Sequence, residues 1–258
     1  MDLTIAGAPM LTLLLASVRI IAWMVLVPPF SSRAIPITAK VMLSLALAVA
    51  GVSMMGPEGI TSVPTTTPDL LGLVLAQIVI GALMGFVTSM LFAAVAAAGA
   101  LIDVFGGFSL AQGFDPLGMT MNSVIGKLHQ MLAVVLLFVS GGHLLVLGGL
   151  LRTFEMLPIG STPDIDTASE VLMRAFHVFF VTAVQIALPL IAVLFLADLG
   201  LALMTKVAPQ LNAINVVFPA KIGLTLLLVG LSFPALPGVM DRLVDLTMQA
   251  TATLAGGA

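Results

Sequence analysis

Long apolar runs separated by short polar stretches dominate this sequence. They extend over residues 9–30, 37–55, 70–101, 126–151, 171–205 and 213–236. A membrane-spanning helix needs roughly 20 apolar residues, so most of these runs predict one span each. The runs 70–101 and 171–205 are longer, which indicates helices that are tilted, broken or extended beyond the lipid. Pro189 predicts a kink in the second of them.

The pattern therefore predicts an all-α integral membrane protein with about six long hydrophobic helices in hairpins. A short tail helix is expected at about 238–253, where Val239, Leu243, Leu246 and Ala250 share one helical face.

Residues 99–121 interrupt the apolar pattern with two carboxylates, several glycines and a proline. Such a segment is a poor continuous lipid-facing helix, and non-helical backbone at membrane depth occurs where it is buried in protein or lines a wet cavity. Its bulky, soft side chains are suited to closing a hole, and Met adapts to varied partners. We therefore predict a constriction loop at about 103–125, with hinge glycines and a turn at Asp115-Pro116.

Composition places this chain outside the soluble globular proteins. Hydrophobic residues make up 60% and charged residues 8%, and the mean hydropathy is +1.23. Soluble domains carry about 25% charged residues, so this chain needs lipid or other subunits around it. A net charge of −3 does not indicate a nucleic-acid partner, and the absence of cysteine excludes disulfides and thiolate metal sites. The three histidines lie far apart and predict no metal site.

Basic residues concentrate in two of the predicted loops, which contain Arg33 with Lys40 and Lys206 with Lys221. Because basic loops remain in the cytoplasm, we expect both loops inside and both termini outside. The first residues lack a basic region, so the first apolar segment is expected to remain in the mature protein. The chain has one Trp and no Tyr, so an interfacial aromatic belt is nearly absent. Genome composition or helices that mostly face other protein both account for this.

Three ionisable residues lie inside apolar runs: Arg19, Asp103 and Asp198. Charges at such positions are usually paired or face water. They fit a structural role, as an ion pair, at a subunit interface or at a helix end, better than an ion or proton pathway. The alternative is a secondary transporter with Asp103 and Asp198 as coupling acids and a broken helix near Gly106-Gly107. An intramembrane enzyme would need a serine–histidine, paired-aspartate or metal constellation, which the sequence does not offer.

Several short motifs occur along nearly the whole chain in a specific order and spacing. They are Arg19 before Pro28-Pro29, Ile35-Pro36 with Lys40, Ile80-Gly81 with Gly85-Phe86, Ala98-Gly99 with Ile102-Asp103, Gly107 to Asp115-Pro116, Gly141-Gly142-His143, Leu157-Pro158-Ile159-Gly160, and Ala208-Pro209-Gln210-Leu211-Asn212 through Pro219. With these motifs the sequence resembles the FliR/SctT family of the type III secretion export gate, and it is most similar to the flagellar branch.

The resemblance implies a helical hetero-oligomer with FliP- and FliQ-like membrane subunits at the base of the flagellum, in the bacterial inner membrane. Residues 1–185 would form a FliP-like part and residues 186–258 a FliQ-like helical hairpin. The assembly would conduct unfolded flagellar subunits, so the resemblance predicts protein export and neither an enzyme nor a cofactor.

The resemblance also assigns residues to sites. The plug region at the pore would contain Phe105, Gly106, Gly107, Phe108, Leu110, Phe114, Asp115, Pro116, Met119 and Met121. A cytoplasmic turn near an FlhB-like partner would contain Lys206, Pro209, Gln210, Asn212, Pro219 and Lys221.

Overall fold

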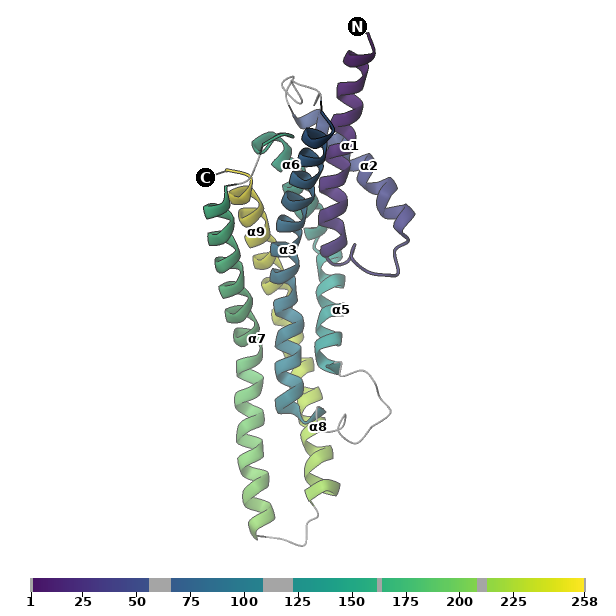
Figure 1. The fold of residues 1–258 in the computed structure, drawn as a ribbon. Helices are drawn as coiled ribbons and strands as arrows, with labels where there is room; N and C mark the ends of the chain where they lie inside the picture. Colours follow the sequence, from purple (N-terminus) through teal and green to yellow (C-terminus); the bar gives the residue numbers. More distant parts are fainter. Residues whose placement is uncertain (1, 56–65, 109–122, 162–163, 208–212, 258) are drawn as a thin grey trace. The chain divides into compact units, whose positions relative to one another are not determined.

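The computed structural model describes residues 2–55, 66–108, 123–161, 164–207 and 213–257. Every regular element in these ranges is helical, as Figure 1 shows. In chain order they are α1 (Asp2–Leu26), α2 (Ile37–Met54), α3 (Thr67–Gly106), α5 (Val124–Val139), α6 (Gly142–Met156), α7 (Ile165–Val207), α8 (Ala213–Ser232), the 3-10 turn η1 (Phe233–Ala235) and α9 (Leu236–Leu254). The all-α fold and the tail helix expected from the sequence are confirmed.

Five helices are long and apolar enough to cross a membrane, or six when α5 and α6 are counted as one broken span, among the residues described. The two long apolar runs form single helices of 40 and 43 residues, and α7 continues on both sides of Pro189. The run 126–151 differs from the expectation of one segment. It is divided at Ser140 and Gly141, where Gly141 has φ +73°, a left-handed conformation that ends α5 and starts α6.

Short polar residues define where the long helices begin. The Asp69 backbone N–H donates to Thr66 Oγ1 at 3.3 Å, and Thr66 Oγ1 donates to Asp69 Oδ2 at 2.7 Å, a reciprocal cap at the start of α3. At α7, the exposed Asp164 accepts from the hydroxyl of Thr167 at 2.6 Å and from its N–H at 3.0 Å. Both hydrogen bonds lower the pKa of the Asp164 carboxyl, and the bond from the Thr167 hydroxyl has the larger effect.

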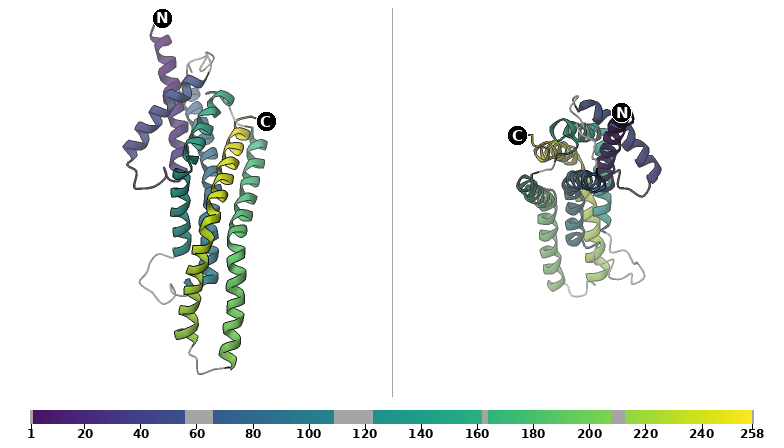
Figure 2. Two further views of the ribbon diagram at one scale, coloured as in Figure 1. Left: turned by 180° about the vertical axis from the view of Figure 1, so that it is seen from behind. Right: turned by 45° about the horizontal axis from the view of Figure 1, so that its top comes forward.

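The described chain divides into two compact units. Unit 1 contains residues 1–91, 141–176 and 242–258, and unit 2 contains residues 92–140 and 177–241. In unit 1, α1 and α2 form a hairpin whose ribbon is seen in Figure 2. Trp23 is fully buried there, with its ring centroid 5.7 Å from that of Phe30.

Glycines bring α3 against the backbone of α1 within unit 1. A Cβ at Gly81 would clash with the carbonyl oxygen of Arg19, and one at Gly85 would lie 3.0 Å from the carbonyl oxygen of Trp23. Gly72, earlier in the same helix, has no atom within 4 Å of its Cβ position. Small residues at these two positions therefore set the close packing of the two helices.

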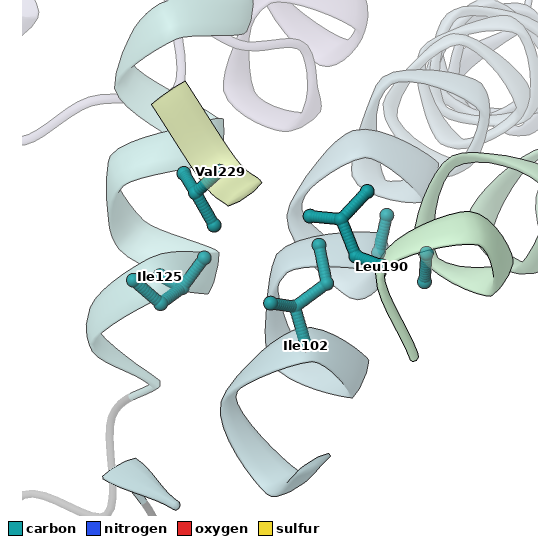
Figure 3. Packing of buried hydrophobic residues seen from close by; sticks show 6 residues of the cluster. Ile102, Ile125, Leu190 and Val229 are labelled. Atoms are coloured by element: carbon teal, nitrogen blue, oxygen red, sulfur yellow. The ribbon is translucent and has the colours of Figure 1, made fainter. Parts of the chain in front are cut away.

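In unit 2, four helices contribute to one apolar core. Figure 3 shows Ile102 of α3, Ile125 of α5, Leu190 of α7 and Val229 of α8 gathered together, with Ala98 and Ala187 in the same cluster. Phe108, which follows α3, packs against this cluster. The core therefore joins the end of α3 and the start of α5 to the other two helices.

Candidate functional site

The C-terminal end of α3 is fixed to α8 by a buried threonine. The Thr225 hydroxyl lies 2.8 Å from the carbonyl oxygen of Lys221 and 3.3 Å from that of Gly106, within hydrogen-bonding distance of both. A Cβ at Gly106 would lie 2.6 Å from the Thr225 methyl carbon, so a larger residue here would force Thr225 to move. The last turn of α3, which contains the predicted plug residues Phe105 and Gly106, is thus held against a neighbouring helix.

The next residue, Gly107, leaves the helix with φ +86°, a conformation that residues with a Cβ rarely adopt. Its Cβ position would be 3.5 Å from the side chain of Lys221. The Lys221 ammonium in turn lies 2.7 Å from Asp198 Oδ1 and 2.8 Å from Oδ2, a salt bridge between α8 and α7. A single side chain of α8 therefore contacts the exit from α3 and bonds to α7.

The N-terminus of α5 is fixed to α3 by a carboxylate. Asp103 is 3% exposed, and its Oδ1 accepts the Ile125 N–H at 3.3 Å. Ser123 caps the same helix by accepting the Gly126 N–H at 2.7 Å. A carboxylate at a helix N-terminus is also favoured by the helix dipole. Asp103 therefore serves as the second cap of α5 from a different helix.

Two glycines allow α3 and α5 to approach at this point. A Cβ at Gly99 would lie 2.7 Å from both Gly126 Cα and the Ile125 carbonyl oxygen. One turn into α5, the buried His129 donates from Nδ1 to that same Ile125 carbonyl at 3.0 Å. Within the described residues, Asp103 Oδ2 and His129 Nε2 have no hydrogen-bond partner. The contacts place both boundaries of the segment 109–122 on one tightly packed group of helices.

Replacing Asp103 by alanine is expected to destabilise unit 2 by about 1–3 kcal/mol, because the buried Ile125 N–H loses its acceptor. Asp103→Asn retains an acceptor oxygen and is expected to lose less. Thermal unfolding of the purified chain in detergent micelles measures both effects. Equal losses for the two variants would show that the carboxylate charge, and not the hydrogen bond, is what the site needs.

Arg19 forms a second polar site, in unit 1, and is fully buried. Its Nε donates to Gln77 Oε1 at 2.8 Å, and its Nη1 donates to the Leu157 carbonyl oxygen at 3.0 Å. Its guanidinium carbon lies 4.4 Å from the centre of the Phe154 ring, a cation–π contact. Arg19 thereby connects α1 to α3, to α6 and to the residue that follows α6.

Some of the remaining predicted site residues are described by the structure, and others lie outside the described residues. Phe105 lies in α3 and is 37% exposed, and Lys206 and Pro219 are exposed. Residues 103–106, which fall within the bounds of the predicted pore loop, are helical and belong to α3. Among the predicted plug and turn residues, Leu110, Phe114, Asp115, Pro116, Met119, Met121, Pro209, Gln210 and Asn212 lie outside the described residues. The described part of the chain contains no group of three metal-ligating side chains.

Sequence reasoning missed Thr225, which holds Gly106, and did not pair Gln77 with Arg19. Both are polar residues fully buried within apolar helices. Their position inside an apolar run was the available signal, since buried polar side chains need a partner. The partner itself depends on which helices are adjacent, and a single sequence does not give that.

Several known proteins resemble this chain in sequence over most of its length. The flagellar biosynthetic protein FliR of Pectobacterium carotovorum is 31% identical over 241 residues, which cover 90% of this chain and 91% of that protein. FliR of Escherichia coli K12 is 31% identical over 225 residues, covering 87% and 85%. The Yop proteins translocation protein T of Yersinia pestis is 28% identical over 219 residues, covering 82% and 81%.

Residues 10–247 also match the family described as bacterial export proteins, family 1. The match extends from α1, which contains Arg19, into α9, and includes both polar sites described above. The chain belongs to family 1 of the bacterial export proteins.

Proposed function

We propose that this chain forms, together with FliP- and FliQ-like membrane subunits, the channel through which unfolded flagellar subunits cross the inner membrane. Family membership makes it a multi-pass membrane component of a flagellar or related type III export apparatus, and not an enzyme. Its place is the flagellar basal body, with residues 1–185 in a FliP-like part and 186–258 in a FliQ-like hairpin. The long apolar helices with many exposed hydrophobic side chains suit both lipid and subunit contacts.

The observation that carries the proposal is the anchoring of both boundaries of the segment 109–122. Gly106 and Gly107 are held by α8, and Ile125 and Gly126 are held by α3. A plug that seals a pore and yields to an unfolded chain needs fixed attachment points. It also needs a soft surface without specific hydrogen bonds, which phenylalanine and methionine provide. We assign this role to Phe105–Phe108, Leu110, Phe114, Asp115-Pro116, Met119 and Met121.

The turn with Lys206, Pro209, Gln210, Asn212, Pro219 and Lys221 is assigned to the cytoplasmic end, next to an FlhB-like subunit. Its basic residues are consistent with the cytoplasmic side. The transporter alternative receives no support from the geometry, because Asp198 pairs with Lys221 and Asp103 caps α5.

Purification from the native membrane tests the assembly. The tagged chain would be isolated in mild detergent and the bound proteins identified by mass spectrometry. We expect stoichiometric recovery of FliP- and FliQ-like subunits. Recovery of the chain alone, or as a simple homodimer, would contradict the channel, and a transport assay on Asp103 and Asp198 variants would then follow.

Ion leakage tests the plug separately. In cells that express the assembled gate, Gly107→Ala and Phe114→Ser are expected to raise passive ion permeability, because one strains the hinge and the other removes a bulky apolar group. Val124→Ala is the matched control, since Val124 lies at the far boundary of the segment and is 55% exposed. If both variants export normally without a measurable leak, the assignment of the plug is wrong.

A further inference from the structure

At the contact between Arg19 and Gln77 in unit 1, hydrogen-bond donors outnumber acceptors. Arg19 Nη2 and Gln77 Nε2 are buried and make no hydrogen bond within the described part of the chain. Both are donor atoms, and both residues are fully buried. Buried donors without acceptors are rare in proteins, so two of them on side chains that contact each other indicate that an acceptor belongs there.

The chemistry of the Arg19–Gln77 contact explains this imbalance. In a guanidinium, the Nε–H and one N–H of Nη2 point in the same direction and fit the two oxygens of a carboxylate. The Gln77 amide has only one oxygen, and it accepts from Nε. The amide nitrogen beside it is a donor, so it cannot accept from Nη2. Turning the amide over would exchange the two bonds and leave the same excess of donors.

Charge is also unbalanced at this position. Arginine remains protonated in proteins. In the described parts of the chain, the groups that contact its guanidinium are an amide, a backbone carbonyl and an aromatic ring, which are all neutral. The salt bridge found among the described residues, Lys221–Asp198, lies in unit 2 and does not involve Arg19. A buried charge without a counter-charge costs several kcal/mol.

We propose that a small inorganic anion of the size of chloride binds in unit 1 between Arg19 Nη2 and Gln77 Nε2. The ion supplies the missing acceptor and the missing negative charge together. A water molecule would supply only the acceptor. Arg19 and Gln77 are both fully buried, so the proposed ion is enclosed within this chain.

Chloride dependence of stability tests the proposal. The full chain in detergent micelles would be unfolded by heat while sodium chloride replaces sodium gluconate at constant ionic strength. We expect a saturable rise in Tm of about 5 °C for the natural sequence. In Gln77→Glu, the new carboxylate takes the place of the ion, so Tm should be higher in gluconate and should not respond to chloride.

Two outcomes would overturn the proposal. One is a Tm that does not depend on chloride in the natural sequence, which would leave a water molecule as the acceptor. The other is an equal chloride response in the natural sequence and in Gln77→Glu, which would place the ion elsewhere. Crystals of the natural chain grown in bromide give an independent readout if Gln77→Glu does not fold. An anomalous peak beside Arg19 Nη2 is expected, and its absence overturns the site.

Discussion

Replacing Gly99 by alanine is expected to push α5 away from α3 and to destabilise the protein by about 3 kcal/mol, the upper end of the usual cost of overpacking. The new Cβ would lie 2.7 Å from Gly126 Cα, 2.7 Å from the Ile125 carbonyl oxygen and 2.9 Å from the Gly126 nitrogen. All three are backbone atoms, so no side-chain rotation relieves the contact. The same shift would lengthen the Asp103–Ile125 hydrogen bond. The Tm of thermal unfolding and the amount of bound subunits recovered on purification should both decrease.

Gly223→Ala provides the matched control in the same unit. Gly223 is exposed in α8, and no atom lies within 4 Å of its Cβ position. Alanine favours helix over glycine, so this variant is expected to be neutral or more stable by up to about 1 kcal/mol. Similar losses in both variants would mean that α3 and α5 do not pack as closely as the structure has them.

Replacing Gln77 by leucine is expected to destabilise unit 1 by about 3–5 kcal/mol, because it leaves a buried guanidinium with fewer partners. Leucine removes the acceptor of the Arg19 Nε–H and fills the space with apolar groups. The bond from Arg19 Nη1 to the Leu157 carbonyl alone does not compensate for a buried charge. Chemical or thermal unfolding in detergent micelles, compared with the natural sequence, measures the loss.

Arg19→Met,Gln77→Leu is the informative companion variant. Methionine removes the charge that leucine leaves unpaired, so the double variant should recover much of the stability lost by Gln77→Leu alone. A double variant that is less stable than Gln77→Leu would instead assign the main contribution of Arg19 to its contacts with Phe154 and Leu157.

Hydropathy predicted the positions of most helices correctly, but it did not reveal the boundary between α5 and α6. The predicted runs 37–55 and 213–236 correspond to α2 and α8, because apolar side chains and helix length together define a span. The run 126–151 hides a break at Ser140 and Gly141, since a short polar interruption changes a hydropathy average very little. The conformation of Gly141, and not its hydropathy, ends the helix there.

The sequence predicted which polar residues would be buried, but it did not predict which residues they would contact. The burial of Arg19 and Asp103 follows from their position within apolar runs. Their partners, Gln77 and the Ile125 N–H, are 58 and 22 residues away in sequence. Such pairs form only once particular helices are adjacent in a particular register. Periodicity within one helix contains no information about that register.

The close contacts made by α3 also have a genetic consequence. A Cβ at Gly81, Gly85 or Gly99 would lie 3.0 Å or less from backbone atoms and one at Gly106 would lie 2.6 Å from the Thr225 side chain, whereas Gly72 in the same helix has open space around it. Every missense change in a glycine codon adds a side chain and therefore one of these contacts. In a library of random mutations, the four positions should be depleted in missense changes, while Gly72 should accept many residues. The inherited variation of this helix would therefore concentrate in the codons between its glycine contacts.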